Sequence, residues 1–169
     1  RSYKVKDKNV RLNSSVMPSL NAMLEAFEQE SGIDDVIIVS GYRTIEDQDR
    51  IFKNKAREVG EREALAWAAL PKNSEHHTGL ALDFSIYKDD GTSHNYTGTG
   101  EYAWLNDNAW RYGWIVRYRP EKREQTGIAY EPWHFRYVGA PHAELMERGG
   151  LCMEEYLEGL KDYPFGVRH

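Results

Sequence analysis

The amino-acid sequence predicts an α+β fold, a single domain in which a small antiparallel sheet is flanked by helices. Three observations lead to this prediction. Helix-like and strand-like segments follow one another without a regular βαβ alternation, two late strand-like segments flank a turn-like stretch typical of a hairpin, and 169 residues suffice for one hydrophobic core. We therefore expect one domain over residues 1–169, with the polar residues 1–13 as an N-terminal arm.

The elements of the first half follow from hydrophobic spacing and from capping residues. Apolar residues at positions 20, 23, 24 and 27 repeat at helical spacing and predict an amphipathic helix over residues 15–30, ended by Gly32. The β-branched run 36–39 predicts a buried strand. Thr44 is a good N-cap for a helix that ends at Gly60, and the alanine-rich residues 61–70 predict further helix.

The second half contains the remaining strands. Residues 80–85 alternate, so that Leu82 and Phe84 face the core while Asp83 faces the other way. A loop over 88–100 and a helix over 101–112 are expected to come next. Strands over 113–118 and 133–138 flank the charged, turn-like residues 119–127, and helices over 141–148 and 152–161 complete the chain.

Charge and hydropathy exclude some partners. The net charge is −5 and the basic residues are dispersed, so no nucleic acid is expected as a partner. No apolar run approaches the roughly 18 residues of a membrane helix, so no membrane contact is expected from this sequence. Because the sequence begins at Arg1, we expect a leader or membrane anchor to lie outside it. We also expect a monomer, with its only cysteine, Cys152, unpaired.

Two short runs, 74–83 (SEHHTGLALD) and 131–134 (EPWH), together predict a metal site. Two imidazoles and one carboxylate can hold a zinc ion and leave one coordination position for water. Asp83 would supply the carboxylate from the strand face opposite the core, and His134 lies on the strand face opposite Phe135. Spacing leaves His76 and His77 as alternatives for the other imidazole, because neighbours on an extended chain point in opposite directions.

Glu131 lies close enough to His134 in sequence to accept a proton from a water molecule at this site. In a straight strand the two side chains would point to opposite faces, but Pro132 can introduce the bend that brings both to one cleft. Taken singly, each of these residues could also be an ordinary surface or hydrogen-bonded side chain. The residues alone therefore give the metal site as a hypothesis.

The motif Ser74-x-His76-x-x-Gly79-x-Ala81-x-Asp83, followed by Glu131-x-Trp133-His134, resembles the motif pair of the zinc D-alanyl-D-alanine carboxypeptidases. More closely, the chain is similar to the VanY-type D,D-carboxypeptidases and their L,D-carboxypeptidase relatives. The run from Ser40 to Arg43 with Gln48, and residues 130–139 and 151–157, extend the likeness over about residues 33–160.

This resemblance implies the fold of the zinc D-Ala-D-Ala peptidases, which is Hedgehog-like, and it assigns roles to individual residues. It selects His76 over His77 as a ligand, makes Glu131 the general base, and gives Arg43 the scissile carbonyl or the terminal carboxylate of the substrate. We further expect Tyr130 and Trp133 to contact substrate, because they flank Glu131 and His134. The expected site comprises Zn2+ ligands His76, Asp83 and His134, catalytic residues Glu131 and Arg43, and substrate-binding residues Arg43, Gln48, Ser74, Tyr130 and Trp133.

The implied activity is removal of the C-terminal D-alanine from peptidoglycan stem peptides that end in D-Ala-D-Ala. The substrate would place the protein on the cell-wall side of the bacterial membrane, and the family suggests a link to glycopeptide antibiotic resistance. Three alternatives stay open: an L,D-carboxypeptidase acting on tetrapeptide stems, a D-Ala-D-Ala dipeptidase, and a cell-wall-binding module with a vestigial metal site. The sequence does not distinguish the first two from the D,D-carboxypeptidase, whereas the intact Glu131 argues against the third.

Overall fold

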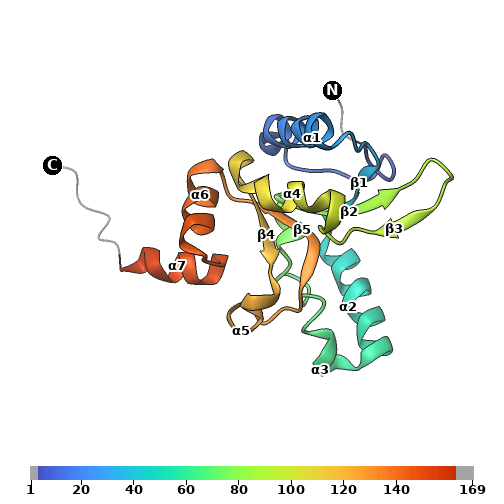
Figure 1. Ribbon diagram of the computed structural model, residues 1–169. Helices are drawn as coiled ribbons and strands as arrows, with labels where there is room; N and C mark the ends of the chain where they lie inside the picture. Colours follow the sequence, from blue (N-terminus) through green and yellow to red (C-terminus); the bar gives the residue numbers. More distant parts are fainter. Residues whose placement is uncertain (1–3, 163–169) are drawn as a thin grey trace.

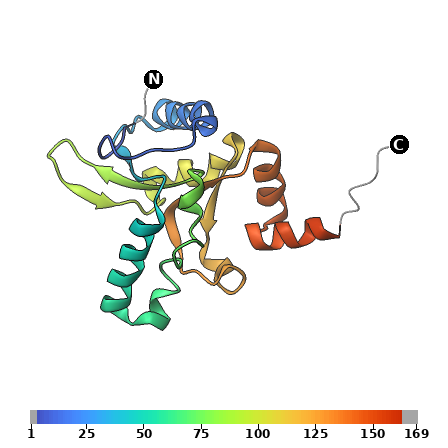
Figure 2. The ribbon, with the colours of Figure 1, turned by 180° about the vertical axis from the view of Figure 1, so that it is seen from behind.

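A computed structural model describes residues 4–162 as an antiparallel sheet with helices on both sides (Figures 1 and 2). The strand order is β1-β2-β5-β4, with β3 added to β2, and every pair of neighbours is antiparallel. The strands are β1 Val36–Ser40, β2 Ala81–Tyr87, β3 Ser93–Asn95, β4 Trp114–Tyr118 and β5 Glu131–Tyr137. The predicted α+β class is therefore confirmed.

The helices include several short 3-10 turns. The α-helices are α1 Met17–Ser31, α2 Ile45–Val59, α3 Glu61–Ala64, α4 Ala103–Asn108, α5 Arg123–Thr126, α6 Ala140–Gly149 and α7 Met153–Lys161. The 3-10 turns are η1 Ser14–Val16, η2 Glu75–Thr78, η3 Gly100–Tyr102, η4 Ala109–Tyr112 and η5 Pro120–Lys122. The predicted cap of α2 is confirmed, because the Thr44 hydroxyl accepts a hydrogen bond from the Asp47 amide at 3.1 Å.

The hydrophobic core lies on the sheet face that α1 and α4 cover (Figure 1). Met23 and Phe27 of α1 are buried there together with Leu82 and Phe84 of β2 and Phe135 of β5. Since neighbouring residues on a strand point to opposite faces, this packing turns the residues next to them in β2 and β5 toward the other face. The burial of an apolar face thus selects which side of the sheet carries the polar site.

Four predicted elements differ in extent from the structure. Residues 61–70 are helical only in α3, because later carbonyls bond to other parts of the chain: Ala66 accepts from the Ala129 amide and Ala69 from the Gln48 side chain. The expected loop 88–100 contains β3, and the turn-like residues 119–127 contain η5 and α5. The helix expected over 101–112 is divided into η3, α4 and η4.

The N-terminal arm contacts the sheet edge through an isolated parallel bridge between Val5 and Ile38. Residues 1–3 of the expected arm lie outside the described residues, and the single-domain division stays a prediction. Between residues 4 and 162, no helix is both long enough and apolar enough to cross a bilayer.

A buried polar chain ties α4 to the start of β5. The Tyr96 hydroxyl donates to Asn106, whose side-chain amide donates to the Pro132 carbonyl at 3.1 Å. We expect Asn106→Leu to lower the free energy of unfolding by about 2–4 kcal/mol, because the buried Pro132 carbonyl loses this donor and the buried Tyr96 hydroxyl keeps only a 3.4 Å contact with the Tyr102 carbonyl. Urea unfolding measures this, with Asn108→Leu as the control, since Asn108 bonds only within its own helix. Equal losses in the two variants would contradict the prediction.

Candidate metal centre

Three polar side chains meet on the sheet face opposite the core. Asp83 of β2 and His134 of β5 are directly paired across neighbouring antiparallel strands, so their side chains share one face. His76 reaches them from η2, the turn that leads into β2. Ser74 caps this turn through a hydrogen bond from the His76 amide at 3.3 Å, and Gly79 ends it in the left-handed conformation.

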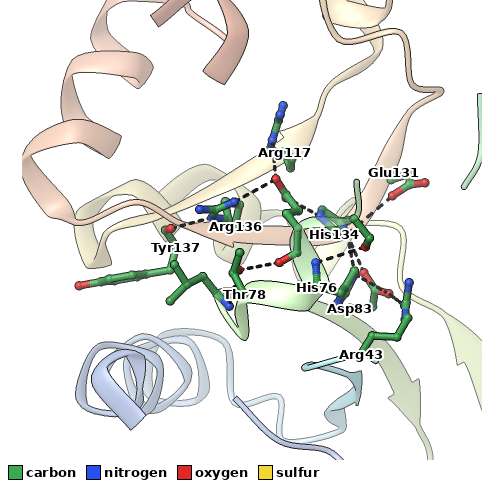
Figure 3. Close-up of polar contacts among 12 residues, drawn as sticks. Arg43, His76, Thr78, Asp83, Arg117, Glu131, His134, Arg136 and Tyr137 are labelled. Atoms are coloured by element: carbon green, nitrogen blue, oxygen red, sulfur yellow. Dashed lines mark hydrogen bonds and ion pairs between the residues drawn. The ribbon is translucent and has the colours of Figure 1, made fainter. Parts of the chain in front are cut away.

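The ligand-type atoms of these side chains lie at hydrogen-bond distance from one another (Figure 3). His76 Nε2 is 3.2 Å from His134 Nδ1 and 3.4 Å from Asp83 Oδ2. His134 Nδ1 is 2.9 Å from Asp83 Oδ1. The structure therefore gathers three donors from positions far apart in the sequence into a group able to hold a metal ion.

The outer nitrogens of both rings are already occupied. His76 Nδ1 lies 2.8 Å from the Gly41 carbonyl, and His134 Nε2 lies 2.7 Å from Glu75 Oε1. Each of these nitrogens must donate, because a carbonyl or a carboxylate oxygen can only accept. In the neutral rings, the two nitrogens that face each other then carry lone pairs, and Asp83 adds an anionic oxygen. A positive charge at this point, supplied by a proton on His134 or by a metal ion, satisfies these acceptors.

The pKa values agree with a positive charge at this point. Burial lowers the pKa of His134, but its hydrogen bonds with Asp83 and Glu75 outweigh burial and raise the pKa to about 10. Burial raises the pKa of Asp83, yet the two histidines hold it well below its usual range. The cluster thus favours cationic charge at its centre in spite of its burial.

The donor set fits zinc. Zinc prefers imidazole and carboxylate ligands in tetrahedral geometry, and bonds of about 2.0–2.1 Å separate such ligand atoms by about 3.3 Å. The observed separations of 2.9, 3.2 and 3.4 Å bracket that value. Three protein ligands also leave one tetrahedral position free, as catalytic zinc sites require.

His77 is turned away from this group. Its Nδ1 donates to the Arg43 carbonyl at 2.7 Å, and its Nε2 accepts from the Lys72 amide at 3.2 Å. Both ring nitrogens are therefore used by the backbone. The geometry brings His76, and not His77, to Asp83 and His134, which spacing alone left undecided.

An irregularity in β5 brings Glu131 to the same cleft. The β4–β5 register shifts between the pairs Val116–Phe135 and Tyr118–Glu131, so β5 carries extra residues around Pro132. Glu131 Oε2 consequently lies 3.8 Å from His134 Nδ1, as the expected bend at Pro132 requires. Burial raises the pKa of the Glu131 carboxyl to about 7, although His134 and Arg43 oppose this shift. A pKa near neutrality suits a group that accepts and returns a proton.

Arg43 lies beside Asp83, at the edge of the group of candidate ligands. Its guanidinium donates to Gln48 Oε1 at 2.7 Å and to Ser40 Oγ at 2.8 Å, and it lies 3.5 Å from Asp83 Oδ2. Burial lowers the pKa of Arg43, whereas the Asp83 and Glu131 carboxylates act to raise it. The Gln48 amide nitrogen donates to the Ala69 carbonyl, which orients Gln48 Oε1 toward the Arg43 guanidinium.

A cleft of about 580 Å³ opens beside the cluster. Of the residues expected to bind substrate, Arg43, Gln48, Ser74 and Trp133 line it, together with Glu131 and the three metal-site side chains. Tyr130 is exposed at the surface and is not among the described residues that line this cleft. The substrate-binding roles of all five residues stay predictions.

Sequence reasoning missed Glu75, Arg117, Arg136 and Tyr118. Glu75 Oε2 forms ion pairs with Arg117 at 3.0 Å and with Arg136 at 3.2 Å, on the side of His134 away from Asp83 (Figure 3). The Tyr118 ring lies against His134, with 5.1 Å between ring centroids. One signal was available for Glu75, which stands between Ser74 and His76 in the motif, and another for Arg136, which shares a strand face with His134.

Comparison with known proteins adds independent information. Residues 9–140 match the VanY family, described as D-alanyl-D-alanine carboxypeptidase. The chain is 39% identical to a D-alanyl-D-alanine carboxypeptidase of Enterococcus faecalis over 87% of the chain and 56% of that protein. The chain thus spans about half the length of the curated relatives it matches.

Solved structures give the same grouping. One is the vancomycin-resistance D,D-pentapeptidase VanY of a VanB-type cassette in complex with Zn(II), with a TM-score of 0.78 and 37% identity over 92% of this chain and 89% of that one. Another is the LD-carboxypeptidase LdcB, with a TM-score of 0.80 and 35% identity over 93% of this chain and 75% of that one. Both D,D- and L,D-specific proteins are therefore similar to this chain.

Proposed function

We propose, for a chain that belongs to the VanY family of D-alanyl-D-alanine carboxypeptidases, a zinc-dependent D,D-carboxypeptidase activity. The substrate would be a peptidoglycan stem peptide ending in D-Ala-D-Ala, and the product released would be D-alanine. The observation that carries this proposal is the convergence of His76 Nε2, His134 Nδ1 and Asp83 beside the Glu131 carboxylate in one cleft.

His76, Asp83 and His134 would hold the ion. When bound there, zinc would supply Lewis acidity that makes water easier to deprotonate near neutral pH. Glu131 accepts the proton of the attacking water as its oxygen adds to the scissile carbonyl carbon, and it returns a proton to the leaving amine as the C–N bond breaks. Glu131 Oε2 lies 3.8 Å from His134 Nδ1, which places the carboxylate beside the ligand group where the transfer would occur.

Arg43 would bind the reacting end of the peptide. Two of its N–H groups point to Gln48 and Ser40, which fixes the plane of the guanidinium and leaves its other donors for substrate. A planar fork of donors matches a carboxylate or a developing oxyanion. The neighbouring Asp83 and Glu131 carboxylates keep this arginine charged in spite of burial.

L,D-carboxypeptidase activity on tetrapeptide stems is the second candidate. The observation that favours it is the likeness to LdcB, which covers 93% of this chain, against 92% for VanY. Both activities use the same ligands and base, and they differ in the configuration of the residue before the scissile bond. A D-Ala-D-Ala dipeptidase stays an alternative, because the D,D-dipeptidase VanXYg is similar to this chain to the same degree as LdcB. The intact Glu131 argues against a vestigial binding module.

Incubation of the zinc-loaded protein with matched stem peptides tests the assignment. We expect release of D-alanine from a pentapeptide ending in D-Ala-D-Ala, with a higher kcat/KM than for the tetrapeptide that lacks the last residue. Mass spectrometry of both reactions measures this. Faster cleavage of the tetrapeptide would assign the L,D-activity instead, and no cleavage of either peptide by folded, zinc-loaded protein would contradict the proposal.

Such a substrate is encountered on the cell-wall side of the membrane, and we propose that location together with a monomeric state. A contribution to glycopeptide resistance would follow if the protein shortened D-Ala-D-Ala stems in the cell. The activities and partners of any longer protein that includes this chain belong to the same proposal.

A further inference from the structure

We propose that Glu75 is a positioning residue for the metal site: its carboxylate fixes the ring of His134 so that Nδ1 faces the ion. This inference rests on the proposed zinc site and adds a residue to which neither the family resemblance nor the site prediction gave a role. Glu75 stands between Ser74 and His76, at a position to which the motif assigns no residue type.

Glu75 contacts His134 directly. Glu75 Oε1 lies 2.7 Å from His134 Nε2, and both side chains are almost fully buried. Because an ionised carboxylate accepts and cannot donate, Glu75 holds a proton on Nε2. The opposite nitrogen, Nδ1, lies 2.9 Å from Asp83 and 3.2 Å from His76 Nε2. When Asp83 and His76 bind an ion, the neutral ring held by Glu75 presents the lone pair of Nδ1 to that ion.

In this arrangement Glu75 cannot itself be a ligand of the ion that His76, Asp83 and His134 would hold. It bonds to the Nε2 edge of the imidazole, while the other ligand atoms lie at the Nδ1 edge. The group of potential metal ligands accordingly contains His76, Asp83 and His134 without Glu75. A carboxylate on the outer nitrogen of a metal-binding histidine fixes the ring orientation and raises its basicity.

Two arginines hold the Glu75 carboxylate in place. Its other oxygen, Oε2, is 3.0 Å from Arg117 Nε and 3.2 Å from Arg136 Nη1. These two ion pairs fix the position of Oε2, and the carboxylate is thereby held with Oε1 directed at His134 Nε2.

Arg117 links this arrangement to the C-terminal helix. Its guanidinium forms a two-pronged ion pair with Glu154 of α7, and it stacks at 4.8 Å over the Tyr118 ring that lies against His134. Glu154 does not contact His134 directly. A substitution of Glu154 removes an ion-pair partner of Arg117 but leaves the Glu75–His134 hydrogen bond in place. A Glu154 variant is therefore a matched control.

The alternative role for Glu75 is purely structural, as the anion that neutralises two buried arginines. In that case its loss would lower the free energy of unfolding but would leave metal affinity and the His134 tautomer unchanged. The positioning role predicts changes in both of these properties, so the two roles can be separated without measuring peptidase activity.

The test compares Glu75→Ala, Glu75→Gln and the control Glu154→Gln by zinc titration against a chromophoric chelator. We expect Glu75→Ala to bind zinc about 10–100-fold more weakly than the unaltered chain. The zinc affinity of Glu75→Gln should lie between those of Glu75→Ala and the unaltered chain, because its amide oxygen can still accept from His134 Nε2 but no longer neutralises the arginines. Glu75→Gln also tests the proposal if Glu75→Ala fails to fold. Glu154→Gln should bind zinc as the unaltered chain does.

Nitrogen-15 NMR of the zinc-loaded proteins supplies the second readout. In the unaltered chain, His134 should show a slowly exchanging proton on Nε2, and this signal should be lost in Glu75→Ala and kept in Glu154→Gln. Unchanged zinc affinity with an unchanged Nε2 signal in the folded Glu75 variants would overturn the positioning role. Failure of the unaltered chain to bind zinc would instead overturn the proposed function, so the two failures are distinguishable.

Discussion

Replacement of Glu131 by glutamine is expected to lower kcat/KM for a D-Ala-D-Ala peptide by about 10²–10⁴-fold, the contribution typical of a positioned general base. Glutamine preserves the size of the side chain but cannot accept a proton from water. Zinc affinity should stay close to that of the unaltered chain, because Glu131 lies 3.8 Å from His134 Nδ1 and outside the group of candidate ligands. Steady-state kinetics together with zinc titration measure the two effects separately.

The control for this variant is Glu124→Gln, which changes an exposed carboxylate on α5 by the same chemistry. Its kinetics should match those of the unaltered chain. Turnover by Glu131→Gln at the unaltered rate would remove Glu131 from the mechanism, and loss of zinc from this variant would mean that the carboxylate belongs to the ligand set.

Removal of the His76 imidazole is expected to abolish stoichiometric zinc binding and, with it, peptidase activity. His76 supplies one of only three protein donors, so its loss should weaken zinc affinity by more than the roughly 10–100-fold typical of residues that merely support a ligand. The adjacent His77→Ala is the matched control. Its ring bonds only to backbone groups of Arg43 and Lys72, so this variant should keep its zinc.

Metal analysis after dialysis, followed by isothermal titration with zinc, measures both histidine variants. Retention of zinc by His76→Ala together with its loss from His77→Ala would reverse the assignment that the geometry makes. Zinc-loaded His77→Ala should also hydrolyse the peptide, although its fold should be less stable, because the Lys72 amide loses its hydrogen-bond partner.

The parts of the fold that follow short-range rules were accessible from the sequence. The apolar positions of α1 and the capping hydroxyl of Thr44 set helix boundaries by local geometry, and the alternation around Asp83 correctly separated the core face from the polar face. The pairing of β2 with β5 was not accessible in the same way. It depends on tertiary packing that no local pattern encodes.

The errors have a common physical cause. Alanine-rich residues after Ala64 favour a helix locally, yet the carbonyls of Ala66 and Ala69 are bonded to Ala129 and Gln48, and these tertiary contacts outweigh local propensity. The strand β3 was read as loop because Ser93–Asn95 has no apolar alternation and is exposed; its pairing with β2 alone makes it a strand.

For the site, residue types and motif order were sufficient to identify candidate ligands. The orientation of their side chains could not be predicted from the sequence. Spacing could not separate His76 from His77, because the choice depends on carbonyl groups of Gly41 and Arg43 that lie more than thirty positions away. The bend that joins Glu131 to His134 was expected at Pro132, and the register shift in β5 provides it. Glu75 was missed because an isolated glutamate carries no signal of the two arginines that hold it.

The most direct test of the central claim is a crystal structure of the zinc-loaded protein with anomalous diffraction recorded on both sides of the zinc absorption edge. We expect one strong anomalous peak per chain, about 2.0–2.1 Å from His76 Nε2, from His134 Nδ1 and from an Asp83 oxygen. A peak at His77, at Cys152 or at Glu75, or no peak in this cleft from a crystal that contains zinc, would contradict it.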